Sequence, residues 1–119
     1  MLKNLQDGND NNIVNENNYI VGEHVITVWK EFQSEQLAWY LGIVDEILPH
    51  GKVDISYFEP CDKTLKKWVL PEDSKYLTDQ RQVMYKHVKV CYSHGKTIRC
   101  TLDEELVAQC NDMIKTFTF

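Results

Sequence analysis

From Tyr19 to Cys100 the chain is a succession of short runs rich in β-branched and aromatic residues, each ended by a polar, glycine or proline break. Such residues suit the pleated, half-buried surface of a β-strand. In the third run the apolar side chains of Val53, Ile55 and Tyr57 recur at every second position, which places them on one face of a strand. Five to six strands are therefore expected, at residues 19–29, 38–48, 52–59, 65–70, 87–92 and 97–100.

The breaks between these runs are short, and they favour antiparallel pairing. Pro49–Gly51 and Ser93–Lys96 are expected to be tight turns, residues 72–78 to be irregular, and residues 79–85 to hold a single helical turn. Gly42 lies inside the second run, where glycine marks a bend, a bulge or a close approach of two backbones. No connection suggests a parallel crossover, so the strands are expected to close into a small barrel without exposed edges.

The apolar period changes after Cys100, and this change predicts an α-helix over about residues 102–115. Thr101 and Glu104 have the spacing of a capping box, and Lys115 in the last turn suits the helix dipole. The apolar stripe is expected to cover the open end of the barrel, with a partner surface as the alternative. The residues of the stripe recur at helical spacing: Leu102, Leu106, Val107, Cys110, Met113 and Ile114.

A length of 119 residues suits one domain, which we place at residues 19–119. Residues 1–18 are rich in asparagine and poor in apolar side chains, so they are interpreted as a disordered leader or linker. No apolar run reaches the ~20 residues of a membrane span, and the N-terminus lacks a signal-peptide pattern. An intracellular location is expected, with free thiols at Cys61, Cys91, Cys100 and Cys110.

The charge balance bears on the partner. The chain has 18 acidic and 13 basic residues, a formal net charge of -5, which favours a cationic peptide over nucleic-acid phosphates. If the basic residues shared one face, however, lysines and stacking aromatics would bind a nucleic acid. The other interpretation of these residues is a solvated strand face. They are grouped along the chain at Lys63, Lys66 and Lys67, at Lys86, His87 and Lys89, and at Lys96 and Arg99.

The residue pattern does not indicate an enzyme or a metal centre. Cys91, His94 and Cys100 flank one hairpin but lack the ligand spacing of a zinc site. Cys61 lies in an acidic turn, which disfavours the thiolate that a nucleophile needs. The sequence has no glycine-rich phosphate loop. A non-catalytic binding module without metal or cofactor is therefore expected.

Three segments resemble the Tudor-like branch of the SH3-like barrels: Val21–Val25 leading to Trp29, Trp39–Val44, and Val53–Tyr57. In that family the first strand ends near an aromatic residue, the second carries an aromatic followed by a small residue, and the third ends in an aromatic. The resemblance covers about residues 19–76, and the segment from Asp79 onward lies outside it. It implies an SH3-like barrel, extended here by a hairpin and a C-terminal helix, and a nuclear, chromatin-type function.

Many Tudor-like domains hold a methylated lysine or arginine in a cage of aromatic side chains. A methylated cation is poorly hydrated but keeps its charge, and each good contact with an aromatic face contributes about 0.5–2 kcal/mol. By matching positions, the resemblance implies a cage formed by Trp29, Tyr40, Tyr57 and Phe58, with acidic support from Glu59 or Asp62.

The other two tryptophans are expected elsewhere. Trp39 precedes Tyr40 on one strand, so only one of the two can face the cage, and Trp68 is expected in the core. The expected partner is a methylated, histone-like peptide. The alternatives are a nucleic acid, or an unmodified peptide docked by a module of a larger chromatin or mobile-element protein, and the oligomeric state stays open.

Overall fold

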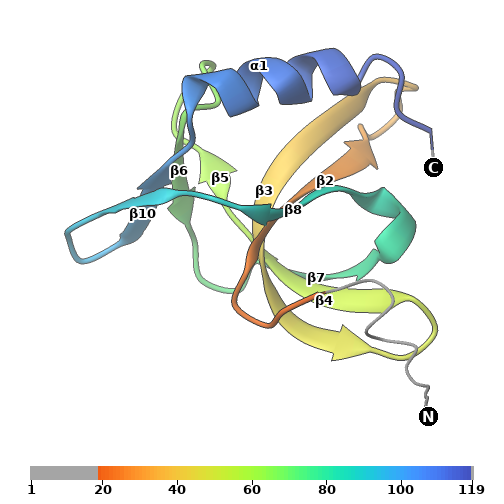
Figure 1. Cartoon of the computed structure of the whole chain (residues 1–119), viewed down its shortest axis with the longest axis horizontal. Helices are drawn as coiled ribbons and strands as arrows, with labels where there is room; N and C mark the ends of the chain where they lie inside the picture. Colours follow the sequence, from red (N-terminus) through yellow and green to blue (C-terminus); the bar gives the residue numbers. More distant parts are fainter. Residues whose placement is uncertain (1–18, 119) are drawn as a thin grey trace, which may run out of the picture.

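The computed structural model describes residues 19–118, and in this range the chain is mainly β with a C-terminal helix, as predicted (Figure 1). The leader interpreted at residues 1–18 lies outside the described residues. The elements follow one another as β2 (His24–Lys30), β3 (Leu37–Leu48), β4 (Lys52–Tyr57), β5 (Glu59–Pro60), β6 (Lys67–Leu70), β7 (Lys75–Asp79), the 3₁₀ turn η3 (Gln80–Gln82), β8 (Val83–Val88), β9 (Cys91–Ser93), β10 (Ile98–Thr101) and α1 (Glu104–Met113).

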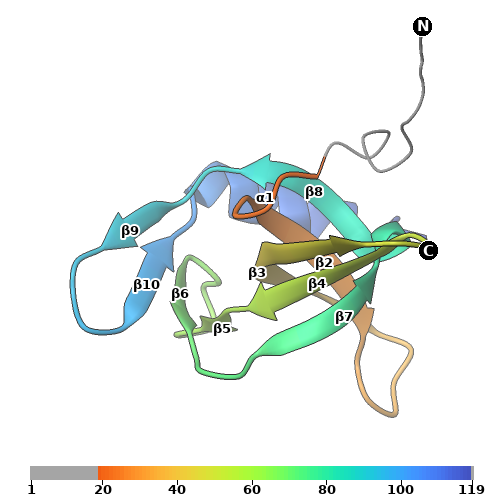
Figure 2. The same ribbon diagram turned by 90° about the horizontal axis from the view of Figure 1, so that it is seen from below.

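The larger sheet is antiparallel and has the order β7-β4-β3-β2-β8. Its two edge strands, β7 and β8, are consecutive in the chain and are joined by η3. A register shift between Val44 and Glu46 interrupts the pairing of β3 with β4, and such a bulge bends the strand that carries it. The sheet curls as a barrel does (Figure 2), but within residues 19–118 no ladder joins β7 to β8, so the sheet stays open.

The second sheet joins two segments that are distant in sequence. Its order is β5-β6-β10-β9. β5 and β6 come between β4 and β7, whereas β9 and β10 follow β8. Trp68 on β6 pairs with Cys100 on β10, and both side chains are buried. The hairpin expected around Ser93–Lys96 is present, and it projects away from the larger sheet in Figure 2.

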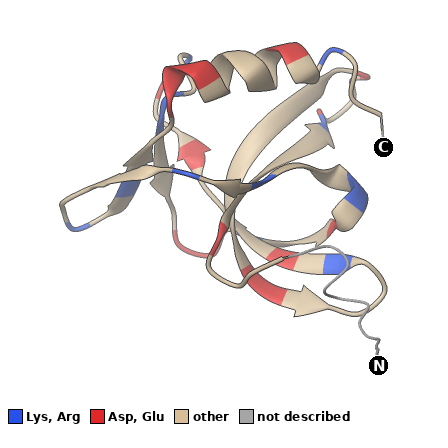
Figure 3. Cartoon of the chain, viewed as in Figure 1, with Lys and Arg blue, Asp and Glu red and all other residues tan. Residues whose placement is uncertain are grey.

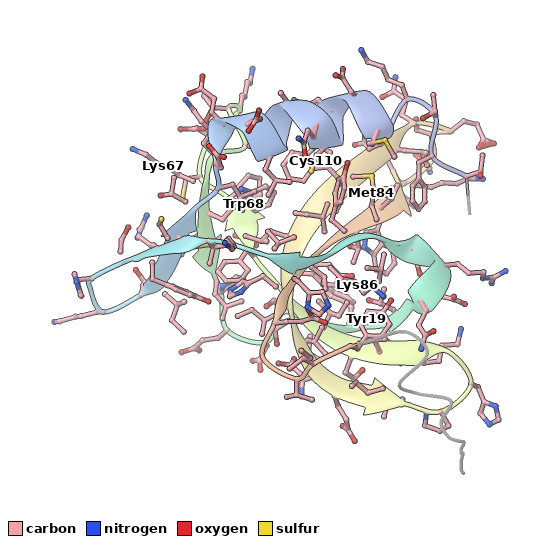
Figure 4. All side chains as sticks on the ribbon, in the orientation of Figure 1. Tyr19, Lys67, Trp68, Met84, Lys86 and Cys110 are labelled. Atoms are coloured by element: carbon pink, nitrogen blue, oxygen red, sulfur yellow. The ribbon has the colours of Figure 1, made fainter. Side chains whose placement is uncertain are left out.

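Opposite faces of the larger sheet carry two separate cores. Side chains alternate along each strand, so Val25 and Tyr57 share one face, where they pack with other buried residues of β3 and β4. Ile26, Trp39 and Leu41 lie on the other face, and they pack against the second sheet and α1. Figure 4 shows Trp68 and Met84 of this second core beneath α1, which itself contributes Cys110.

α1 packs its apolar stripe against this second core, which is shared by the two sheets, so the stripe is covered within the chain and is not left as a partner surface. Val107 and Cys110 are buried against Trp39, and Trp39 Nε1 donates a hydrogen bond of 2.9 Å to Asn111 Oδ1. The physical reason is that an apolar sheet face must be covered by another element. Ile26, Trp39 and Leu41 form such a face here.

The start of α1 differs from the expectation. The helix begins at Glu104, and its N-cap residue is Asp103, whose side chain makes no capping hydrogen bond. The capping box predicted at Thr101 was wrong, because Thr101 belongs to β10 and pairs with Lys67. Lys115 follows the last turn and contacts Asp112 at 3.7 Å.

Several strand boundaries were also predicted wrongly. Residues 72–78, expected to be irregular, contain most of β7, which pairs with β4. The first strand begins only at His24, since Gly22 lies in a turn with a φ of 94°. The strand expected at residues 87–92 is divided between β8 and β9, while the helical turn expected within residues 79–85 is present as η3.

Two further observations concern the cysteines and the membrane. All four cysteines are free, with Cys61 and Cys91 exposed and the other two buried. Within the part of the chain that the structure describes, no helix is long and apolar enough to cross a membrane.

Candidate ligand pocket

A pocket of about 460 Å³ opens on the face of the larger sheet that carries Tyr57. Its walls come from β2, β3, β4 and β7 and from the connection between β6 and β7. We call it the aromatic pocket. The residues that line it are Trp29, Tyr40, Tyr57, Phe58, Glu59, Pro71, Glu72, Asp73, Ser74 and Tyr76.

The hydroxyl group of Tyr57 lies at the base of this pocket and is held by three neighbours. Thr27 Oγ1 donates a hydrogen bond of 3.0 Å to it, Trp29 Nε1 donates one of 3.2 Å, and Thr78 Oγ1 lies 2.8 Å away. Thr27 is on β2 and Thr78 on β7, and two strands separate β2 from β7 in the sheet. One hydroxyl can reach both strands only because this face is concave.

Burial raises the pKa of the Tyr57 phenol, so this group stays neutral and acts as a hydrogen-bond partner. With only 8% of its surface exposed, Tyr57 is fixed by packing as well as by hydrogen bonds. The base of the pocket is therefore formed in advance of any ligand, which lowers the entropy cost of binding.

The aromatic rings around Tyr57 are tilted against one another. Trp29 meets Tyr57 edge-on, with ring centroids 5.8 Å apart and an interplanar angle of 78°. Tyr76 lies 6.2 Å from Tyr57 at 54°. Tyr40 pairs with Thr27 across β2 and β3, which places it on the same face as the Tyr57 base. The rings of Trp29 and Tyr76 are therefore both inclined to the Tyr57 ring, and neither is stacked on it.

The rim of the pocket is acidic. Glu59, Glu72 and Asp73 are exposed residues that line it, and among the described residues that line it there is no Lys, Arg or His. The connection that carries Glu72 and Asp73 is fixed to β4 by a hydrogen bond of 3.0 Å from Tyr57 N to Ser74 O. The two carboxylates are thus held beside the aromatic rings, where they favour a cationic ligand.

The structure brings together most of the residues that the family resemblance implied for a cage. Trp29, Tyr40, Tyr57, Phe58 and Glu59 all line the aromatic pocket. Asp62 does not line it. That carboxylate accepts hydrogen bonds from Thr64 in the next turn, and these bonds lower the pKa of Asp62.

The adjacent pairs Trp39–Tyr40 and Tyr57–Phe58 divide between the two faces of the sheet. Trp39 packs in the core under α1, as the alternation rule requires when Tyr40 faces the pocket. Phe58, only 2% exposed, also belongs to that core and lies 6.0 Å from the His24 ring. Phe58 therefore contributes only a small part of the pocket wall.

Sequence reasoning missed Tyr76, Glu72 and Asp73. All three lie in a segment that was interpreted as irregular, next to the end of the family resemblance. Their proximity to Tyr57 depends on the pairing of β7 with β4, in which Tyr76 is opposite Ile55. The sequence feature that could have pointed to them is the acidic pair Glu72–Asp73 after Pro71, followed closely by the aromatic residue Tyr76.

The basic residues are spread over several elements (Figure 3). Lys66 approaches Glu104 at 3.9 Å, and His87 Nδ1 contacts Glu23. Lys86 Nζ lies 5.0 Å from the centre of the Tyr19 ring, and both residues are labelled in Figure 4. The three groups that suggested a nucleic-acid surface do not line the aromatic pocket.

Two of the four thiols, Cys100 and Cys110, are buried. Burial raises the pKa of Cys100 to about 11 and that of Cys110 to about 12, so neither is a ready nucleophile. In residues 19–118 no group of three or more His, Cys, Asp or Glu side chains could hold a metal ion. Compared with protein-family models, with curated proteins and with solved structures, the chain gave no match.

Proposed function

We propose that this chain is a non-catalytic, Tudor-like binding module that recognises a methylated lysine or arginine side chain of a peptide. The observation that supports the proposal is the composition of the aromatic pocket. Trp29, Tyr40, Tyr57 and Tyr76 line it together with three carboxylates, and no cationic side chain is among its described lining residues. A methylated, histone-like tail in the nucleus is the partner that suits such a pocket.

The chemistry favours a methylated cation over an unmodified one. An unmodified ammonium group is strongly hydrated, and the loss of that water opposes its entry into an aromatic site. Methyl groups reduce the hydration and add apolar surface while the charge remains, so both the aromatic faces and the carboxylates attract the ligand. The pocket volume of about 460 Å³ lies in the range of small-ligand sites.

The direct test compares peptides that differ only in methylation. One glycine-flanked sequence carries lysine, trimethyllysine, arginine or dimethylarginine at the same position, and binding is measured by fluorescence polarisation. We expect at least one methylated form to bind about tenfold tighter than its unmodified form. Equal affinity for methylated and unmodified peptides, or no binding at millimolar concentration, would contradict the proposal.

A pair of variants locates the binding. Tyr40→Ala removes a half-buried wall of the pocket, and we expect it to weaken methylated peptides about threefold to thirtyfold. Phe32→Ala is the control, because Phe32 is an 80% exposed aromatic residue outside the pocket lining. The control should keep wild-type affinity.

Preferential binding of duplex or single-stranded DNA with a steep salt dependence would instead favour the nucleic-acid alternative.

A further inference from the structure

A second pocket, of about 490 Å³, shares Trp29 with the aromatic pocket. Its other lining residues are Lys30, Lys52, Asp79, Arg81 and Gln82. Three of these side chains are cationic and one is anionic, the reverse of the acidic rim around the aromatic pocket. We call it the basic pocket. Two pockets of opposite charge thus meet at one tryptophan.

The single carboxylate of the basic pocket is already compensated. Asp79 Oδ2 accepts hydrogen bonds from Lys52 Nζ at 3.0 Å and from Arg81 Nη2 at 3.2 Å, and Asp79 Oδ1 accepts one from Arg81 Nε at 3.2 Å. These bonds, with Arg81 contributing most, hold the pKa of Asp79 well below its usual range. The Arg81 guanidinium has five N–H groups and the Lys52 ammonium has three, so donors are left for a second anion.

Lys30 is the third cation. It lies 3.4 Å from Glu35, with side-chain exposures of 59% and 89% respectively. An ion pair this exposed contributes little and exchanges readily for a better anion. A phosphate group, with close to two negative charges and three acceptor oxygens, is a stronger partner for clustered lysine and arginine than a carboxylate is.

The two pockets follow one strand. On β7, Tyr76 lines the aromatic pocket, and Asp79, three residues further, lines the basic pocket. At ~3.3 Å per residue, the two positions are about 10 Å apart along the strand. The side chains of Tyr76 and Asp79 point to opposite faces of β7, so a peptide reaches both pockets by passing over Trp29, which lines both, with the two bound side chains a few residues apart.

We propose that the preferred ligand is a peptide in which a phosphorylated serine or threonine lies two to four residues from the methylated lysine or arginine. The methylated cation occupies the aromatic pocket and the phosphate occupies the basic pocket, with Trp29 between them. This inference rests on the proposed function and extends it to the sequence around the methylated residue.

The test uses one peptide family with trimethyllysine at a fixed position and either serine or phosphoserine three residues before or after it. We expect phosphorylation on one of the two sides to tighten binding about fivefold or more. The double variant Lys30→Gln/Arg81→Gln should lose this gain and keep the dependence on methylation. Neither residue lines the aromatic pocket, and both are well exposed.

The matched control is Lys96→Gln/Arg99→Gln, which removes the same two charges from exposed positions of the β9–β10 hairpin. It should keep the gain from phosphorylation, and the unfolding midpoints of both double variants are compared with the wild type. Inorganic phosphate should abolish the tighter binding that phosphorylation causes, and it should leave the methyl-dependent binding unchanged. Displacement of the peptide by a short RNA at lower concentration than by phosphate would overturn the assignment to a phosphopeptide.

The outcomes separate the two proposals. If binding depends on methylation but phosphoserine has no effect either before or after the trimethyllysine, only this inference is overturned. The same holds if the gain from phosphorylation persists in Lys30→Gln/Arg81→Gln. A gain lost equally in the control variant also overturns it, because net charge then explains the effect. Absence of binding by every methylated peptide overturns both this inference and the proposed function.

Discussion

The side chain of Ile55 on β4 packs directly against the backbone of β3 at Gly42. A Cβ atom at this position would meet Ile55 Cγ2 at 2.3 Å and Ser56 O at 3.3 Å. The sequence indicated a bend, a bulge or a close approach at this glycine, and the close approach is what the structure shows. The bulge lies further along, between Val44 and Glu46. Gly42 therefore leaves room for the side chain of Ile55, while Tyr57, its partner in register, would lie 3.4 Å from such a Cβ atom.

We predict that Gly42→Ala lowers the free energy of unfolding by about 1–3 kcal/mol, because the new methyl group overpacks a well-filled core. Denaturant unfolding measures the change. The Ile55→Ala background provides the control, since it removes the atom that the methyl group would meet. The added cost of Gly42→Ala should be smaller there, and an equal cost in both backgrounds would show that Ile55 is not the obstacle.

Some residues of the aromatic pocket could be identified from the sequence, and others could not. Tyr57 could be identified because strand alternation and the family resemblance agree on it, and Tyr40 because only one of the Trp39–Tyr40 pair can face the pocket. Tyr76 could not be identified in this way. Its place beside Tyr57 depends on a strand pairing that brings distant parts of the chain together, and that pairing leaves no local pattern.

The two helical elements begin on aspartates with different contacts. Asp79 caps η3: its Oδ1 accepts a hydrogen bond of 2.9 Å from Arg81 N, while Gln82 Oε1 accepts one of 3.1 Å from Asp79 N. Asp103 precedes α1 and makes no side-chain capping bond. Asp79 therefore stabilises the start of η3 through hydrogen bonds, whereas Asp103 stabilises the start of α1 only through its charge.

We predict that Asp79→Ala lowers the free energy of unfolding by about 1–2 kcal/mol, since it removes a cap. Asp103→Ala should cost only a few tenths of a kcal/mol, because only the interaction with the helix dipole is lost. Thermal and denaturant unfolding at low salt compare the two variants. An equal or larger loss for Asp103→Ala would contradict this account of the two elements.

Some strands could be predicted from their local residue pattern, whereas others form only because they pair with a strand distant in sequence. β4 was predictable from its strict alternation, and α1 from its helical period. β7 and β5 were not, because Lys75–Asp79 is mostly exposed and Glu59–Pro60 is only two residues long. Both acquire their conformation by pairing with β4 and β6, respectively. In the second sheet the β9–β10 hairpin was predicted, but its pairing with β6 was not, because β6 and β10 are distant in the chain.

Besides the shared core, the two sheets meet at a junction between β2 and β9. His24 on β2 contacts Tyr92 on β9 through its Nε2 atom and the Tyr92 hydroxyl, with ring centroids 5.5 Å apart. Partial burial lowers the pKa of His24 below its usual value of 6.5. The neutral imidazole is therefore the form that the folded junction prefers.

This preference makes the stability depend on pH in a defined direction. The unfolded chain binds a proton at His24 more readily than the folded chain, so folding loses stability as the pH falls below about 6.5. Above that value the contribution is fully present. We predict that the wild type loses more stability than His24→Gln between pH 7.5 and pH 5. The difference should be less than about 1 kcal/mol because solvent screens a half-buried ring.

Denaturant unfolding across this pH range checks the prediction. The carboxylates and the His87–Glu23 contact are common to both proteins, so their effects cancel in the difference. Parallel stability profiles for the wild type and His24→Gln would show that the junction histidine does not titrate differently on folding. A relative gain in stability of the wild type at acidic pH would reverse the sign that burial imposes.

The central claim, that the aromatic pocket binds a methylated cation, is tested most directly by NMR of the three tryptophan indole N–H groups. Trp29 lines the pocket, whereas Trp39 and Trp68 are buried in the other core and serve as internal references. Titration with a trimethyllysine peptide should shift the Trp29 indole signal progressively and leave the other two nearly unchanged, with a much smaller effect from the unmodified peptide. An unmoved Trp29 signal at millimolar peptide, or equal shifts with both peptides, would contradict the claim.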